Sequence, residues 1–150
     1  MNCEDRPDQV KVGFSVDPVG RAFGVRRRKR KRGTFLPIVE YGKQVSNALE
    51  LERKTHELLK RYRVRGEWFR CSVSTATAAI LRVAAAAGES GLSKARDEWI
   101  EEQAQAVAII WRRDRCIPTA MRPRVDQLRE EAEKAGENLT ILRRVDCAWA

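Results

Sequence analysis

Apolar residues recur at steps of three and four positions between residues 48 and 62, and this spacing predicts one amphipathic helix. Asn47, followed three residues later by Glu50, is a typical helix start. Glu52 and His56 are four positions apart, so they share a face of the helix beside its apolar stripe. The stripe consists of Ala48, Leu51, Thr55, Leu58, Leu59 and Tyr62.

Two shorter segments have the pattern of strands. Residues 10–14 alternate apolar with small or polar side chains, which predicts a short strand. Residues 35–41 predict a second strand. Pro37 lacks a backbone N–H, so this strand should lie at a sheet edge or carry a bulge.

The remaining pattern is mostly helical. Asp17 and Pro18 predict the start of a short helix through Arg21 and Phe23. Ser74 or Thr75 should cap a helix over residues 76–87 that ends at Gly88. Further helices are predicted over residues 92–113 and 123–135, whereas 139–145 fits either a strand or a helix. Strands and helices mix before Gly88 and helices dominate after it, so we predict an N-terminal domain over 1–88 and a helical extension over 89–150.

The composition favours a polyanionic partner. The chain of 150 residues has 43% apolar residues, enough for a core, and a net charge of +9. Nucleic acid is the first candidate. An unbroken basic run is either a solvated or targeting segment or a contact to the DNA backbone. The run consists of Arg26, Arg27, Arg28, Lys29, Arg30, Lys31 and Arg32.

Other classes of protein are disfavoured. The four cysteines contain no Cys-x-x-Cys pair, and one histidine is too few for common structural zinc sites. Neither a signal peptide nor an apolar run of about 20 residues is present, so we expect no membrane span. A cytoplasmic protein with reduced thiols is the expectation.

Glu67 is a single acid between Gly66 and the aromatic pair Trp68 and Phe69. It is either an exposed turn residue or a metal ligand beside a phosphate. The two aromatic residues are better explained as core anchors than as platforms for stacking bases.

Four segments in order resemble the GIY-YIG nuclease superfamily. They read V-K-V-G-F-S over residues 10–15, D-P-V-G-R over 17–21, L-E-R-K-T-H over 51–56 and R-V-R-G-E-W-F over 63–69. The likeness spans residues 10–87 and is closest to the branch found in phage and mobile-element proteins, in which the second signature strand often reads K-I-G. It implies an α+β fold, a small antiparallel sheet flanked by helices, and hydrolysis of a DNA phosphodiester.

The resemblance also implies residue roles. Arg21 would hold the scissile phosphate, Glu67 would bind the divalent metal, usually Mg²⁺, and His56 would stand near the attacking water or its base. Lys11 stands where the family has a tyrosine. From the residues alone, Arg21 could equally be a solvated helix residue, and His56 could simply pair with Glu52.

The chain departs from the family pattern because the first signature strand, with its tyrosine, is not found before Val10. Either the true start lies upstream, or the domain binds DNA without cleaving it, or His56 or a lysine replaces the tyrosine. A metal-dependent DNA endonuclease and an inactive DNA-binding module are therefore both open. A third reading is a helical interaction protein, with residues 89–150 in assembly. One apolar face there is either packed or a homodimer interface; it consists of Ile100, Ala104, Val107 and Trp111.

Overall fold

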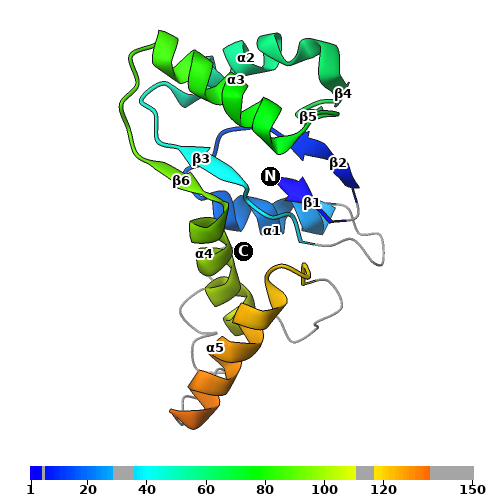
Figure 1. Cartoon of the computed structure of the whole chain (residues 1–150), viewed down its shortest axis with the longest axis vertical. Helices are drawn as coiled ribbons and strands as arrows, with labels where there is room; N and C mark the ends of the chain where they lie inside the picture. Colours follow the sequence, from blue (N-terminus) through cyan, green and yellow to red (C-terminus); the bar gives the residue numbers. More distant parts are fainter. Residues whose placement is uncertain (5, 29–35, 111–116, 136–150) are drawn as a thin grey trace.

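Four short antiparallel strands form one sheet in the order β1-β2-β5-β4 (Figure 1). The computed structural model describes residues 1–4, 6–28, 36–110 and 117–135. A separate pair of antiparallel strands, β3 and β6, joins the two halves of the chain. The strands are β1 (Asn2–Cys3), β2 (Arg6–Lys11), β3 (Tyr41–Lys43), β4 (Arg63–Arg65), β5 (Trp68–Phe69) and β6 (Ser93–Ala95).

Helices cover the sheet and continue beyond it. The helices α2 and α3 lie side by side above the sheet, while α4 leads away from it to α5, which lies alongside (Figure 1). The predicted α+β fold with a small antiparallel sheet and flanking helices is confirmed. The helices are α1 (Pro18–Arg28), α2 (Ala48–Leu58), the short 3₁₀ helix η1 (Lys60–Tyr62), α3 (Val73–Ala86), α4 (Arg96–Ile110) and α5 (Arg122–Lys134).

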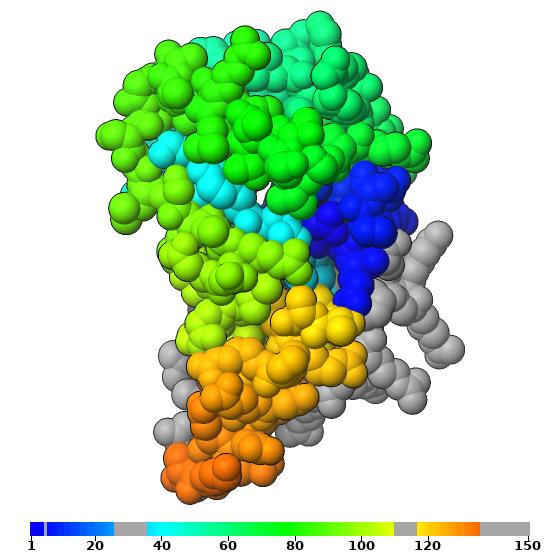
Figure 2. All heavy atoms as spheres, in the orientation of Figure 1, coloured from blue at the N-terminus to red at the C-terminus, as the bar shows by residue number. Residues whose placement is uncertain are grey.

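Two apolar clusters hold these elements together. The first joins the sheet to α3 and the end of α2, with Val10, Leu59 and Phe69 at its centre. The second joins α1 and residues 36–39 to α4 and α5. Ala104 and Val107 are fully buried in the second cluster, so for these residues of the apolar face the packed reading is confirmed. In Figure 2, α4 and α5 form the narrower end of the molecule.

The segment 36–39 is not the regular strand that the sequence predicts. Within it, only Ile38 makes a bridge, to Asn2, and the pairing with β6 begins at Tyr41. The reason is the side chain of Gln103, which accepts a hydrogen bond from Val39 N at 2.8 Å and donates one to Pro37 O at 2.9 Å. A distant amide group therefore occupies backbone groups that a ladder would otherwise use.

The first strand is also different from its prediction. The segment before Val10 does contain a strand, because β1 pairs with β2, and the sheet has four strands rather than two. β1 contains no tyrosine, so the absence of the signature strand with its tyrosine stays a prediction. The strand predicted over 10–14 starts earlier, at Arg6, and ends at Lys11.

The helix starts differ by a few residues from the predictions. The start of α2 is as predicted, because the Asn47 side chain accepts a hydrogen bond from Glu50 N. The cap of α3 is Ser72, not Ser74 or Thr75. α3 ends before Gly88, whose φ of +70° suits a residue without a Cβ. The helix predicted from residue 92 begins at Arg96, because 93–95 pair as β6.

The last helix, α5, starts at Arg122 with Pro123 in its first turn, close to its prediction. Three predictions lie outside the described residues: the side chain of Trp111, the segment 139–145, and the basic run from Lys29 to Arg32. No described helix is long and apolar enough to cross a membrane. The division at Gly88 stays a prediction, although the two parts share the second apolar cluster.

Candidate active site

Glu67 lies in the tight turn that joins β4 to β5. The turn depends on Gly66, whose φ of +54° disfavours any residue with a side chain. The backbone oxygen of Glu67 accepts a hydrogen bond from Val12 N at 3.0 Å, which fixes the turn against the end of β2. The Glu67 side chain remains 36% exposed, so its carboxylate is accessible from solvent.

Two cations converge on the same oxygen of this carboxylate. The Lys11 ammonium contacts Glu67 Oε2, and Arg21 Nη2 lies 3.8 Å from it. A Cβ at Gly13 would lie 3.3 Å from Lys11 Nζ and 3.4 Å from Glu67 Oε2, so the backbone passes very close to this ion pair. A side chain at Gly13 would therefore crowd the Lys11–Glu67 ion pair, which explains the glycine in the V-K-V-G segment.

The start of α1 positions Arg21. Asp17 caps the helix as predicted: its Oδ1 accepts a hydrogen bond from Gly20 N at 2.8 Å, and its carbonyl accepts one from Arg21 N at 3.0 Å. The Ser15 hydroxyl in turn accepts a hydrogen bond from Asp17 N at 3.1 Å. The Nε of Arg21 is buried and has no partner among the described residues. The side chain as a whole is 35% exposed, so an anion can reach the guanidinium through its outer nitrogens.

His56 extends from α2 toward the end of β2. Its Nε2 lies 2.9 Å from Val12 O, and because a carbonyl can only accept, Nε2 is the donor. In the neutral ring Nδ1 is then the atom that can take a proton. The imidazole also lies 3.7 Å from Glu52 Oε1 and 5.1 Å from the centroid of the Phe69 ring. Both sequence readings of His56 are compatible with this position, beside Glu52 and beside the site.

Four predicted residues thus come from four separate segments to one region. The Glu67 carboxylate contacts both Lys11 and Arg21. His56 is linked to this group through its hydrogen bond to Val12 O. Of the predicted aromatic pair, Phe69 is fully buried and Trp68 is half-buried, so Phe69 is confirmed as a core anchor.

Only the first part of the basic run lies within the described residues. The backbone of Arg26, Arg27 and Arg28 belongs to the last turn of α1. Lys29, Arg30, Lys31 and Arg32 lie outside the described residues. Their predicted contact with DNA therefore stays a prediction.

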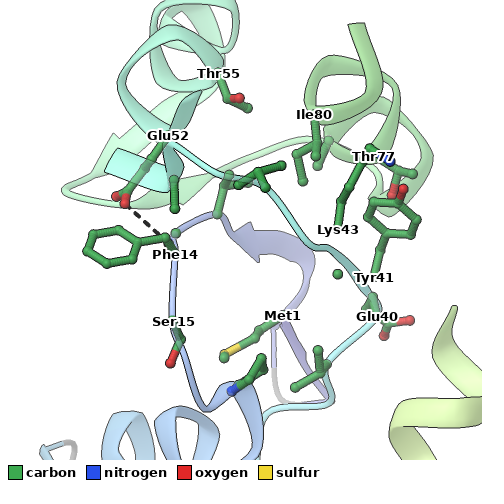
Figure 3. Close-up of a pocket in the computed structure, with 18 of the residues that line it drawn as sticks. Met1, Phe14, Ser15, Glu40, Tyr41, Lys43, Glu52, Thr55, Thr77 and Ile80 are labelled. Atoms are coloured by element: carbon green, nitrogen blue, oxygen red, sulfur yellow. Dashed lines mark hydrogen bonds between the residues drawn. The ribbon is translucent and has the colours of Figure 1, made fainter. Parts of the chain in front are cut away.

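Glu52 is a site residue for which the sequence predicts only a pairing with His56. Its Oε2 accepts a hydrogen bond from Phe14 N at 3.2 Å, drawn as a dashed line in Figure 3. Glu52 thereby links α2 to the loop after β2, next to His56. Its spacing of four residues from His56 was the available signal, but the loop partner is 38 positions away.

A cavity of about 600 Å³ adjoins the site (Figure 3). Lys11 and Arg21 contribute to its wall, as do Glu52, Tyr41 and Lys43. The amino group of Met1 donates to Lys11 O at 2.9 Å, and burial lowers the pKa of that group from 8.0 to about 6. The wall of the cavity therefore combines apolar side chains with charged ones, two of which, Lys11 and Arg21, also contact Glu67.

A metal ion in this region would depend on Glu67. No group of three or more His, Cys, Asp or Glu side chains gathers as a metal site within the described part of the chain. The ion pairs of Glu67 with Lys11 and Arg21 are both at Oε2, and the side chain is 36% exposed, so a ligand can approach the carboxylate from solvent. Mg²⁺ commonly uses one or two carboxylates and completes its octahedral shell with water and phosphate oxygens, so the residues fit such an ion.

The comparisons with known proteins give one match. A family model described as the T5orf172 domain matches residues 1–84, which contain all four predicted site residues. No curated protein and no solved structure matches the chain. The T5orf172 domain is associated with nuclease-like domains of phages and mobile elements. Because the match covers more than half of its length, the chain belongs to the T5orf172 domain family.

Proposed function

We propose that this chain is a metal-dependent DNA endonuclease domain of the GIY-YIG type. The observation that carries the proposal is the meeting of Lys11, Arg21 and Glu67 at one carboxylate oxygen, from three segments far apart in the sequence. Membership of a family with nuclease-like domains supports the same direction. The substrate would be a phosphodiester of DNA and the cofactor Mg²⁺ or another divalent cation.

Arg21 would bind the scissile phosphate. Its guanidinium can donate two parallel hydrogen bonds to phosphate oxygens, which a single ammonium cannot do in the same geometry. The side chain is 35% exposed, so a phosphate can reach it, and the capped start of α1 limits its movement. The contact between Arg21 Nη2 and Glu67 Oε2 keeps the guanidinium beside the carboxylate that would bind the metal.

Glu67 would hold the metal through its carboxylate. A bound divalent cation polarises a phosphate oxygen and stabilises the negative charge on the leaving oxygen. The turn around Gly66 and the hydrogen bond to Val12 N keep this carboxylate in place before substrate arrives.

His56 and Lys11 would manage the protons. His56 Nε2 is committed to Val12 O, which orients the ring and leaves Nδ1 to accept a proton from water. Lys11 stands where the family has a tyrosine. Its side chain is only 9% exposed, and its ammonium can stabilise negative charge that develops next to Glu67.

A second function is favoured by one specific contact. The Lys11 ammonium already neutralises the Glu67 carboxylate, and β1 supplies no tyrosine. A domain with this ion pair intact would bind the DNA backbone through its surplus positive charge without cleaving it. The inactive DNA-binding module is therefore the alternative.

Incubation of supercoiled plasmid with the full chain and Mg²⁺ tests the choice. We expect nicking that depends on the metal and that falls by at least about 100-fold in Glu67→Gln, because the metal contributes several kcal/mol. Glu57→Gln is the matched control, since Glu57 is an exposed acid on α2 that pairs with Lys60. Nicking that survives Glu67→Gln rejects the nuclease mechanism. Salt-sensitive binding without any nicking favours the alternative.

A further inference from the structure

The free edge of the sheet next to Glu67 is unusually basic. β4 is the terminal strand in the order β1-β2-β5-β4, and both of its arginines, Arg63 and Arg65, are exposed. η1, which directly precedes β4, adds Lys60 and Arg61. A basic edge therefore leads along the chain into the turn that carries Glu67.

Part of this edge forms a pocket of about 380 Å³. Its wall contains three arginines and consists of Arg61, Tyr62, Arg63, Val64 and Arg70. Guanidinium groups arranged around one concave surface suit the oxygens of a phosphate, because each can donate more than one hydrogen bond.

Aromatic rings hold two of these guanidinium groups in place. Arg61 lies 4.6 Å above the centroid of the Tyr62 ring and donates to the Tyr62 hydroxyl at 2.6 Å. Arg63 lies 5.5 Å from the centroid of the Phe69 ring. Stacking of this kind restricts the long side chains before a ligand binds, so less conformational entropy is lost on binding.

The positive charge of the pocket is only partly neutralised. Arg70 pairs with Asp8 at 3.3 Å, and Lys60 pairs with Glu57. Among the described residues, neither Arg61 nor Arg63 has a carboxylate within ion-pair distance. Two guanidinium groups therefore remain available to an anionic partner.

The pocket is connected to the candidate active site through one ring. Phe69 contacts Arg63 on β4 and also His56, whose centroid lies 5.1 Å away. Glu67 lies in the turn between β4 and β5, the two strands of this hairpin, which are labelled in Figure 1. A strand of DNA bound at Glu67 could thus continue along the hairpin to this pocket.

We propose that the pocket formed by Arg61, Tyr62, Arg63 and Arg70 is a second phosphate site, which binds the DNA backbone beside the phosphate at Arg21 and Glu67. The inference rests on DNA being the partner, as in the proposed function. The contact is to the backbone, so it positions the DNA without reading its sequence.

The test measures how binding depends on salt. Binding of the full chain to a short fluorescent DNA duplex is followed by anisotropy, without divalent metal, between about 50 and 200 mM salt. The variant Arg61→Gln/Arg63→Gln is compared with Arg82→Gln/Lys134→Gln. The control removes the same charge from exposed positions on α3 and α5.

The expected result is a shallower dependence of log K on log salt for the pocket variant, by about 1.8 for two lost phosphate contacts, with little change in the control. Equal slopes for both variants, or no binding by the wild type, would overturn the inference. The nuclease proposal is tested by a different experiment, and it fails if the wild type does not nick plasmid in the presence of Mg²⁺. The comparison of slopes is unaffected by that result.

Discussion

The ammonium of Lys11 contacts the carboxylate of Glu67, although 56 positions separate the two residues in the chain. The end of β2 and the β4–β5 turn bring them together, and the Lys11 side chain is only 9% exposed. A positive charge therefore already lies at the carboxylate that would bind a metal. Lys11 should both compete with the metal and assist the reaction.

Replacement of this lysine should separate the two effects. In Lys11→Met the metal no longer meets a like charge, so we expect the Mg²⁺ concentration for half-maximal nicking to fall roughly tenfold, equivalent to about 1.4 kcal/mol. The rate at saturating Mg²⁺ should fall, because the group in the tyrosine position is lost. Initial nicking rates over a Mg²⁺ series measure both. Lys54→Met, on the exposed face of α2, should change neither, and an unchanged Mg²⁺ dependence in Lys11→Met would contradict competition.

Substitution of Arg21 tests phosphate recognition at constant charge. Arg21→Lys keeps the positive charge but loses the fork of donors, so nicking should slow by roughly 10- to 100-fold, the equivalent of one charge-assisted hydrogen bond of about 1.5–3 kcal/mol. The melting temperature should not fall, because the buried Nε of Arg21 has no described partner to lose. Plasmid nicking and a thermal melt check the two parts. Arg82→Lys is the control, and equal nicking by both variants would exclude the phosphate role.

Gln103 should be among the most sensitive positions for stability. The side chain is fully buried and bonds to both Val39 N and Pro37 O. Gln103→Ala leaves these two backbone groups without partners, so the free energy of unfolding should fall by about 2–4 kcal/mol. Gln105→Ala, on the exposed side of the same helix, should change it by less than about 0.5 kcal/mol. Urea unfolding of both variants measures the difference, and similar values would show that the bridge is not structural.

The contact between α4 and α5 should weaken in acid. Arg124 donates from Nε and Nη2 to the two oxygens of Glu101, at 2.7 and 2.8 Å. These hydrogen bonds, followed by one from Gln105, lower the pKa of Glu101 from 4.5 to about 2. Because the folded pKa lies below the unfolded one, the pair stabilises the fold above about pH 4.5, and this contribution is lost as the pH falls toward 2.

Glu101→Gln should accordingly lower the melting temperature at pH 7 by only about 1–3 °C, since the pair is solvent-screened. The difference from the wild type should vanish near pH 2. Melting curves over this range test it, with Asp126→Asn as a control for the loss of an exposed acid. A difference that persists at pH 2 would show that the glutamate acts through packing instead of charge.

Local patterns predicted well those features that depend on neighbouring residues. The recurrence of apolar residues at steps of three and four positions predicted α2, and Asn47 caps this helix as expected. The order of short motifs selected Lys11, Arg21, His56 and Glu67, and the structure brings three of them into contact. The roles of these residues in catalysis stay predictions.

Features that depend on distant partners could not be predicted in this way. Residues 36–39 have the composition of a strand, but Gln103 occupies two of their backbone groups. The three residues of β6 form a strand only because β3 lies opposite, about 50 positions earlier in the sequence. The partners that decide these local structures lie outside any short sequence window.

The pairing of β3 with β6 has a practical consequence for anyone who excises this domain. The family match ends at residue 84, before β6 and before Trp99, which packs against Gly42 of β3. A fragment cut at that point would leave β3 as a bare strand edge and uncover the apolar surface under α1, so it should self-associate. The shortest piece suitable for insertion into another protein therefore extends through α5, which covers α4 in the second apolar cluster, well past the border that the family defines.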